Sequence, residues 1–298
     1  MSETAEPQVR EPVNGQVAPS IEHATVTRAG RSDADGPMPP TEVEPHPWRG
    51  LAWLCRRECH RVLKLWRQTI LAPVIAALLF MVVFGLSLGD SISEINGFEY
   101  QVYIVPGLIA MAMAQAAYSN NSSTIFQARN DRYLDDILSA PMSAWQVHLG
   151  FLVGGAMRSL AIGIALTALA VPLTGAPVLN PAEAILAALL LITAFGALGI
   201  IVGIYAQSWD NQSFINNIVI LPLIFLGGVF YSVSRLGTPW EQISHVNPLF
   251  YVVDALRFGF LGSSDVSPWV SLGVVGVITI LLLGWAQFLF VSGHRLKP

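Results

Sequence analysis

The sequence predicts an all-α polytopic membrane protein, and two observations lead to this prediction. The 298 residues are 53% hydrophobic and only 12% charged, with a mean hydropathy of +0.54, whereas soluble domains carry about 25% charged residues. Six stretches also stay apolar for about 20 residues, the length at which an α-helix crosses about 30 Å of hydrocarbon. This composition argues against a soluble enzyme. The net charge of −4 without a basic stripe argues against nucleic acid as a partner.

The chain begins with an acidic, proline-rich segment. Residues 1–47 contain eight prolines and eight Asp or Glu against three Arg, so they have too little apolar surface to offset the entropy cost of ordering. We expect a disordered tail. It is not a signal peptide, because no basic start leads into an apolar stretch.

Residues 48–68 are expected to form an amphipathic helix at the membrane interface, because a basic helix of this kind is attracted to anionic cytoplasmic lipids. A simple topological anchor is the alternative, and the two are compatible. The two cysteines lack the spacing of a disulfide framework or a zinc site and are interpreted as small apolar residues. The apolar positions recur at helical spacing on one face: Leu51, Cys55, Cys59, Val62 and Trp66.

Residues 69–298 are predicted to form a domain of six transmembrane helices. The spans are Thr69–Leu88, Val102–Ser119, Phe151–Leu173, Ala182–Tyr205, Phe214–Ser232 and Val270–Val291. None alternates with the period of two that is typical of barrel strands. Thirteen of the 16 Lys and Arg lie before the first span, between the second and third, or after the sixth. Because positive charge favours the cytoplasmic side, both termini are expected there.

The loop between the second and third spans is predicted to contain a cytoplasmic coupling helix. Within Ile125–Ala140 an apolar side accompanies charges of both signs, and Pro141 ends the helix. Such a surface suits docking to another protein, and a solvated connecting helix is the alternative. The candidate docking residues are Arg129, Arg132, Asp135, Asp136, Ile137 and Leu138.

The segment Tyr231–Pro268 predicts an external helical hairpin before the last span. Asn247 and Pro248 indicate a helix start, because Asn caps a helix and Pro suits its first turn. The helix that follows is too short to span, so we expect it at or in the outer leaflet. Asp254 and Arg257 are spaced to pair on it.

Residue patterns for catalysis or energy coupling are missing from the sequence. It has neither a phosphate-binding GxxxxGK[ST] nor an HExxH pattern. Gly85–Gly89 matches GxSxG, but a nucleophilic serine needs a strand-to-helix turn, and Ser87 lies at the end of a predicted helix. Arg158 lies well inside a span, where snorkelling or pairing would explain it. These features favour a transport subunit that a separate partner powers.

Several short stretches of residues 48–298 carry a family resemblance. They are Leu226–Ser232, Pro239-Trp240, Ile243–Pro248 and Arg257–Gly262, with Val105–Gly107 and Asp135–Pro141 in addition. Together they resemble the membrane subunits of type-2 ABC exporters, which include nodulation-factor and daunorubicin permeases. Many members have Glu-Arg-Gly-Thr where this chain has Asn130–Tyr133, so its docking surface is expected to be tuned to its own ATPase.

The resemblance implies a permease subunit in a bacterial inner membrane, paired with a second copy or a related permease and in contact with membrane lipids. A cytoplasmic ABC ATPase would bind ATP and Mg, so this chain would not itself be an enzyme. The cargo would be an amphipathic drug or lipid, with a polysaccharide or lipid-linked glycan as the alternative. A membrane-embedded enzyme or scaffold is the alternative of another class. The implied external gate and path residues are Leu226, Val229, Phe230, Tyr231, Asn247, Pro248, Phe250 and Arg257.

Overall fold

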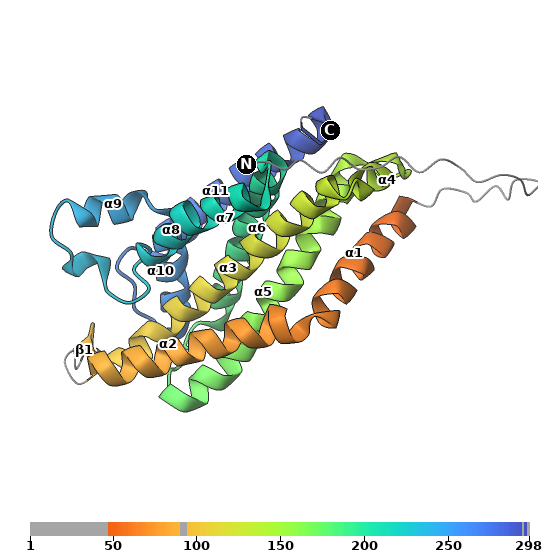
Figure 1. Ribbon diagram of the computed structural model, residues 1–298. Helices are drawn as coiled ribbons and strands as arrows, with labels where there is room; N and C mark the ends of the chain where they lie inside the picture. Colours follow the sequence, from red (N-terminus) through yellow and green to blue (C-terminus); the bar gives the residue numbers. More distant parts are fainter. Residues whose placement is uncertain (1–46, 90–93, 294, 297–298) are drawn as a thin grey trace, which may run out of the picture. The chain divides into compact units, whose positions relative to one another are not determined.

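The structure is a computed structural model that describes residues 47–89, 94–293 and 295–296, and the predicted acidic tail lies outside them. The described part is a bundle of helices with one short β-hairpin (Figure 1). The helices are α1 (Pro47–Lys64), α2 (Ala72–Gly89), α3 (Tyr100–Asn130), α4 (Tyr133–Ser139), α5 (Ala144–Thr174), α6 (Pro181–Tyr205), α7 (Trp209–Ile215), α8 (Leu221–Phe225), α9 (Trp240–Val246), α10 (Pro248–Leu261) and α11 (Pro268–Ser292). The shorter elements are the π-helical turns η1 (Arg67–Leu71) and η2 (Asn216–Ile220), the 3-10 turn η3 (Val233–Arg235), and the antiparallel strands β1 (Glu94–Ile95) and β2 (Phe98–Glu99).

Five helices of the described residues are long and apolar enough to cross a membrane. They correspond to five of the six predicted spans and lie in α2, α3, α5, α6 and α11. Helices α3 and α5 have 31 residues each, about 46 Å at 1.5 Å per residue. Both therefore extend beyond the hydrocarbon layer, which is about 30 Å thick.

The predicted fifth span, Phe214–Ser232, has a different form in the structure. Here α7, η2 and α8 form one helical run, Trp209–Phe225, about 25 Å long. The run ends because the chain turns at Gly227 and Gly228, and Gly228 has a φ of 75°, which other residues rarely adopt. The described residues thus show five long spans, and the count of six stays a prediction.

Helix α3 lies at the centre of the bundle and packs against α2, α5, α6 and α10. Its closest approach is to α6, where glycines replace side chains. A Cβ atom added at Gly203 would lie 2.6 Å from the Ser122 carbonyl oxygen, which is closer than van der Waals contact. The α3–α6 contact therefore depends on the absence of a side chain at Gly203.

Helix α1 packs against α5 through a face that differs from the predicted one. Leu54 and Val62 are buried as an apolar face requires, but between them lies the fully buried carboxylate of Glu58. Trp66, expected on this face, is 48% exposed. The predicted face is packed in part, since Leu51 and Val62 are buried. Glu58 joins it because Arg61 donates two hydrogen bonds to this acid, at 3.0 and 3.2 Å.

Candidate coupling and gate sites

The predicted coupling helix, Ile125–Ala140, is divided in the structure because a turn interrupts the helical conformation within that range. Helix α3 continues to Asn130, and α4 begins only at Tyr133. Between them Arg132 has a left-handed φ of 60°, which ends one helix and redirects the chain into the next. After Pro141 the chain enters α5 at Ser143, and the Gln146 side chain accepts a hydrogen bond from the Ser143 amide at 2.9 Å.

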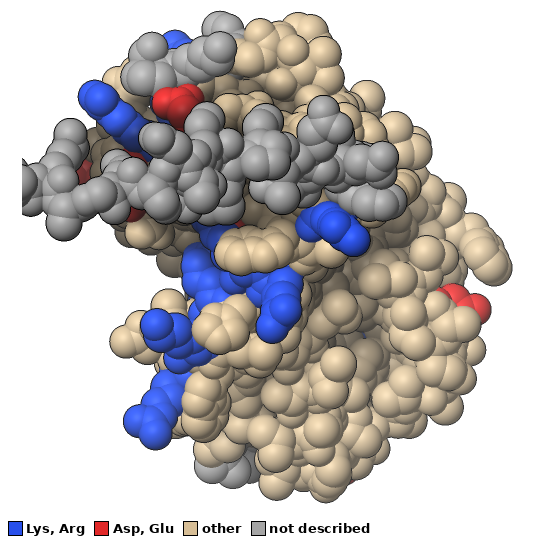
Figure 2. Space-filling view, turned by 90° about the vertical axis from the view of Figure 1, so that its right-hand side faces the viewer, with Lys and Arg blue, Asp and Glu red and all other residues tan. Residues whose placement is uncertain are grey.

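Helices α1 and α4 border an open groove of ≈ 590 Å³. Leu54, Ile137 and Met142 provide apolar lining, and the guanidinium carbon of Arg57 lies 4.6 Å from the centre of the Tyr133 ring, so it links the two helices. Burial raises the pKa of the Tyr133 phenol, which therefore stays neutral at physiological pH. Figure 2 shows the side of the molecule on which α1 and α4 lie in Figure 1. Lys and Arg side chains gather on this side.

Five of the six predicted docking residues divide into an exposed and a buried group. Arg132, Asp135 and Asp136 are exposed on the surface of α4 and the turn before it. Ile137 is buried in this chain's own core, and Leu138 is half-buried against it.

Arg129 lines a hollow together with Arg132 and Asp135, and it also contacts another helix. Its guanidinium donates to the carbonyl oxygens of Gly203 and Ala206, at 3.2 and 3.1 Å, and to that of Ile204. These carbonyls belong to the end of α6, where backbone acceptors lack partners within the helix. Arg129 thus caps α6. The sequence did not reveal this role because the two segments are more than 70 residues apart.

The predicted gate segment after α8 contacts the last part of α2 and the first part of α3. Val229 is fully buried, and its carbonyl oxygen would lie 2.6 Å from a Cβ atom added at Gly107 of α3. The Phe230 ring centre lies 4.7 Å from that of Phe84 in α2, and the Phe230 carbonyl accepts from the Tyr100 hydroxyl at 3.3 Å. The segment therefore closes against the ends of two spanning helices.

Leu226 and Tyr231, which flank this contact, differ in exposure. Leu226 is 37% exposed and available to another surface, whereas Tyr231 is half-buried.

Asn247 starts α10 as predicted. Its side-chain oxygen accepts from the Leu249 amide at 3.0 Å, and its amide nitrogen donates to the Leu223 carbonyl at 2.7 Å. Asn247 thereby caps one helix and holds the end of the preceding helical run, while Pro248 occupies the first position of α10.

Helix α10 is mostly buried within this chain. It packs against α3, α6 and α11, and Phe250 and Phe260 are 1% and 4% exposed within this chain. The sequence suggested a surface helix because its length and its two charged residues resembled those of an interfacial segment. Both charges are instead accommodated inside the bundle.

The expected pair of Asp254 and Arg257 is replaced by separate partners. The Arg257 guanidinium donates to the Gly228 carbonyl at 2.8 Å and lies 4.1 Å from the centre of the Tyr103 ring. Asp254 accepts from the Asp265 amide at 2.7 Å and from the Ser271 hydroxyl at 2.8 Å. Arg257 therefore connects α10 to the gate segment, and Asp254 connects it to α11.

Asp265 is a positioning residue that the sequence analysis missed. Its carboxylate accepts from the Ser232 hydroxyl at 2.7 Å and from the Val233 amide at 3.0 Å. One side chain thus links the loop before α11 to the turn after α8. A single acid in a Ser-rich loop carries no local pattern from which this contact could be predicted.

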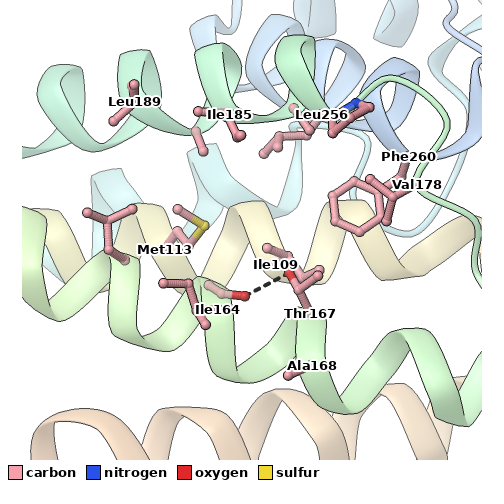
Figure 3. A pocket seen from close by; sticks show the side chains of 15 residues that line it. Ile109, Met113, Ile164, Thr167, Ala168, Val178, Ile185, Leu189, Leu256 and Phe260 are labelled. Atoms are coloured by element: carbon pink, nitrogen blue, oxygen red, sulfur yellow. Dashed lines mark hydrogen bonds between the residues drawn. The ribbon is translucent and has the colours of Figure 1, made fainter.

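An apolar hollow lies between α5 and α6, with α3 and α10 behind it (Figure 3). Its volume is ≈ 410 Å³. Thr167 is a polar residue in the lining of the hollow, and its hydroxyl donates to the Gly163 carbonyl of the same helix at 2.8 Å. The hollow therefore has the chemistry to contact hydrocarbon.

The fold and these sites together define a polytopic helical membrane protein with a groove at one end and a packed hairpin near the other. Comparison with known proteins agrees. The family model for ABC-2 type transporters matches residues 49–261. The inner membrane transport permease YadH of Escherichia coli (strain K12) is 34% identical over 241 residues, which cover 80% of this chain and 94% of that protein. Nodulation protein J of Rhizobium leguminosarum bv. viciae is 24% identical over 240 residues, covering 79% and 92%. The chain belongs to the ABC-2 type transporter family, and the predicted resemblance is confirmed.

Arg257→Met should loosen the gate segment, because it removes a charged hydrogen-bond donor from a buried carbonyl. A loss of about 1.5–3 kcal/mol is expected, seen as a lower thermal unfolding midpoint in detergent and faster proteolysis after α8. Arg235→Met removes an exposed arginine nearby and is the matched control. Equal behaviour of the two variants would show that the Arg257 contacts contribute nothing.

Proposed function

We propose that this chain is the membrane subunit of an ATP-driven exporter in a bacterial inner membrane. Two permease subunits, each with six spans and both termini in the cytoplasm, would form the transport path. A separate cytoplasmic ABC ATPase would bind ATP and Mg and supply the energy. The family membership carries this proposal, since relatives that match nearly their full length are named as transport permeases.

The groove between α1 and α4 supports docking of the ATPase at this end. It combines an apolar lining with charges of both signs, the half-buried Arg57 and the exposed Asp136. Interfaces gain specificity from complementary charge around an apolar centre. Trp53, 73% exposed on the same groove, would become buried when a partner binds.

The end of α8 and the turn after it support a gate at the end opposite the groove. Val229 and Phe230 close against α2 and α3, while Phe225 and Leu226 remain 36% and 37% exposed beside them. In a dimer, these exposed apolar residues would meet the second subunit and seal the path.

An amphipathic drug or lipid is the cargo that the chemistry of the hollows favours. The hollow of Figure 3 offers apolar side chains to its occupant. A polysaccharide or glycan would need many hydrogen-bonding groups along its path, and the hollow lacks them among its described lining residues.

Orientation can be tested with introduced thiols in a Cys55→Ser/Cys59→Ser background. Ser263→Cys lies in the loop before α11 and Ser143→Cys in the loop before α5. In intact cells an impermeant maleimide should label the former thiol and spare the latter until the membrane is opened. Labelling of the Ser143→Cys protein from outside would invalidate the proposed orientation.

The docking surface can be tested by charge reversal on α4. Asp135→Lys/Asp136→Lys should weaken copurification of the ATPase, because like charges opposed across an interface cost several kcal/mol. Glu94→Lys/Glu99→Lys changes two exposed acids of the β-hairpin by the same charge and should leave copurification intact. If α4 reversal has no effect on ATPase recovery, docking involves another surface.

A further inference from the structure

Arg158 of α5 borders a cavity that is separate from the groove and the gate segment. The cavity has a volume of ≈ 180 Å³ and is enclosed by α2, α3 and α5. At about 30 Å³ per molecule, roughly six waters would fill it. Its walls are otherwise mostly apolar, with Phe80 of α2 and Leu108 and Met111 of α3 among them.

The guanidinium of Arg158 has most of its hydrogen-bonding capacity unused. Its Nε donates to the Thr69 carbonyl at 3.0 Å, next to the π-turn η1, and this bond fixes the side chain against α2. Of the five N–H donors in a guanidinium, the four on its two terminal nitrogens have no partner among the described residues. The described carboxylates likewise form no ion pair with it.

A cation without a counter-charge inside a spanning helix is energetically costly, and such residues commonly mark substrate or ion pathways. The Glu58 carboxylate does not offset this cost, because it already pairs with Arg61 at 3.0 Å. What the position lacks is an anion.

Gln115 supplies a second polar group on the cavity wall. Its side-chain nitrogen donates to the Asn216 side-chain oxygen at 2.9 Å, which fixes the amide. Its side-chain oxygen is buried and has no partner among the described residues. The cavity therefore presents cationic donors from α5 and a neutral acceptor from α3.

The adjoining surface of α2 is suited to hydrocarbon. Ile75 and Leu79 are 55% and 61% exposed, and Ala76 and Phe80 of the same helix line the cavity. A ligand with its charge on Arg158 would place a chain along this surface.

We propose that the cavity binds the anionic head of an amphiphile, with a phosphate or carboxylate on Arg158 and a hydroxyl donating to Gln115. The hydrocarbon chain lies along α2. A bilayer phospholipid and an anionic cargo share this chemistry. Only the assignment to cargo rests on the proposed export function, because binding needs no ATPase. The hollow of Figure 3 lacks an equivalent cation among its lining residues.

The test measures protection of a thiol in the cavity, using the full-length permease in phosphatidylcholine nanodiscs. Ala112→Cys places the thiol on the cavity wall in the Cys55→Ser/Cys59→Ser background, and its alkylation by N-ethylmaleimide is followed by intact mass. Dodecyl phosphate should slow alkylation, whereas dodecanol, with the same chain and no charge, should not.

The arginine variants test the role of the cation. Arg158→Gln should raise the half-protecting concentration of dodecyl phosphate about tenfold, since a charged hydrogen bond is lost, and Arg158→Lys should have an intermediate effect. Arg56→Gln removes an exposed charge from α1 and should leave protection unchanged. Equal protection by dodecanol, or an unchanged Arg158→Gln variant, would overturn the proposal. If Arg158→Gln fails to fold, the Arg158→Lys variant and the comparison with dodecanol decide.

Nanodiscs of phosphatidylglycerol distinguish the two sources of the amphiphile. Slow alkylation there without added probe assigns the site to a bilayer lipid. Fast alkylation that dodecyl phosphate still slows assigns it to a mobile amphiphile, as a cargo would be. Failure to recover an ATPase with the chain would remove the proposed export function and leave this binding result unchanged.

Discussion

The contact between the polar half of α3 and the glycine-lined face of α6 positions the rest of the bundle. Within a membrane, polar groups must find partners inside the protein. Asn121 donates to the Gly196 carbonyl at 3.1 Å, and Ser122 accepts from Gln212 of α7 at 2.8 Å. A glycine at position 196 lets the Asn121 side chain approach closely. One helix thereby fixes the positions of α6 and α7.

The same region of α3 holds α1. Arg61 donates to the Asn120 side chain at 3.3 Å and to the Thr124 hydroxyl while it neutralises Glu58. Helix α3 therefore joins α1 through its polar half, α4 through its end, and the gate segment through Gly107 near its start. In the proposed mechanism this single helix, about 46 Å long, would carry movement from the ATPase groove to the gate.

Hydropathy alone could predict the five long spans, because an apolar run of that length has few alternatives to a membrane helix. Hydropathy underestimated the length of α3. The polar continuation of this helix from Ser119 to Thr124 is helical only because α6 and α1 supply hydrogen-bond partners. Hydropathy placed the end of the predicted fifth span too late in the sequence, because the helical run ends at Phe225. The left-handed turn at Gly228 and the contacts with α3 follow it. The helix start at Asn247 was predictable because the Asn-Pro pair acts locally.

The tertiary roles of charged residues could not be predicted in this way. Arg129 was assigned to docking from its neighbours in sequence, and this role stays a prediction, whereas its capping of α6 is visible only in the fold. Asp254 and Arg257 have the spacing of a pair. In the folded chain, however, Asp254 accepts from Ser271 and Arg257 donates to the Gly228 carbonyl. The burial of Glu58 likewise depends on its pairing with Arg61 in the packed helix. In each case the deciding contact comes from the fold.

The central claim is that this chain transports only together with a separate ATPase. The most direct measurement is native mass spectrometry of the tagged chain, purified in nanodiscs from the organism that encodes it. The account predicts a complex containing two permease subunits and ABC ATPase subunits, with ATP turnover that is lost when the permease is removed. A chain recovered repeatedly without an ATPase, from membranes in which it is active, would contradict the account.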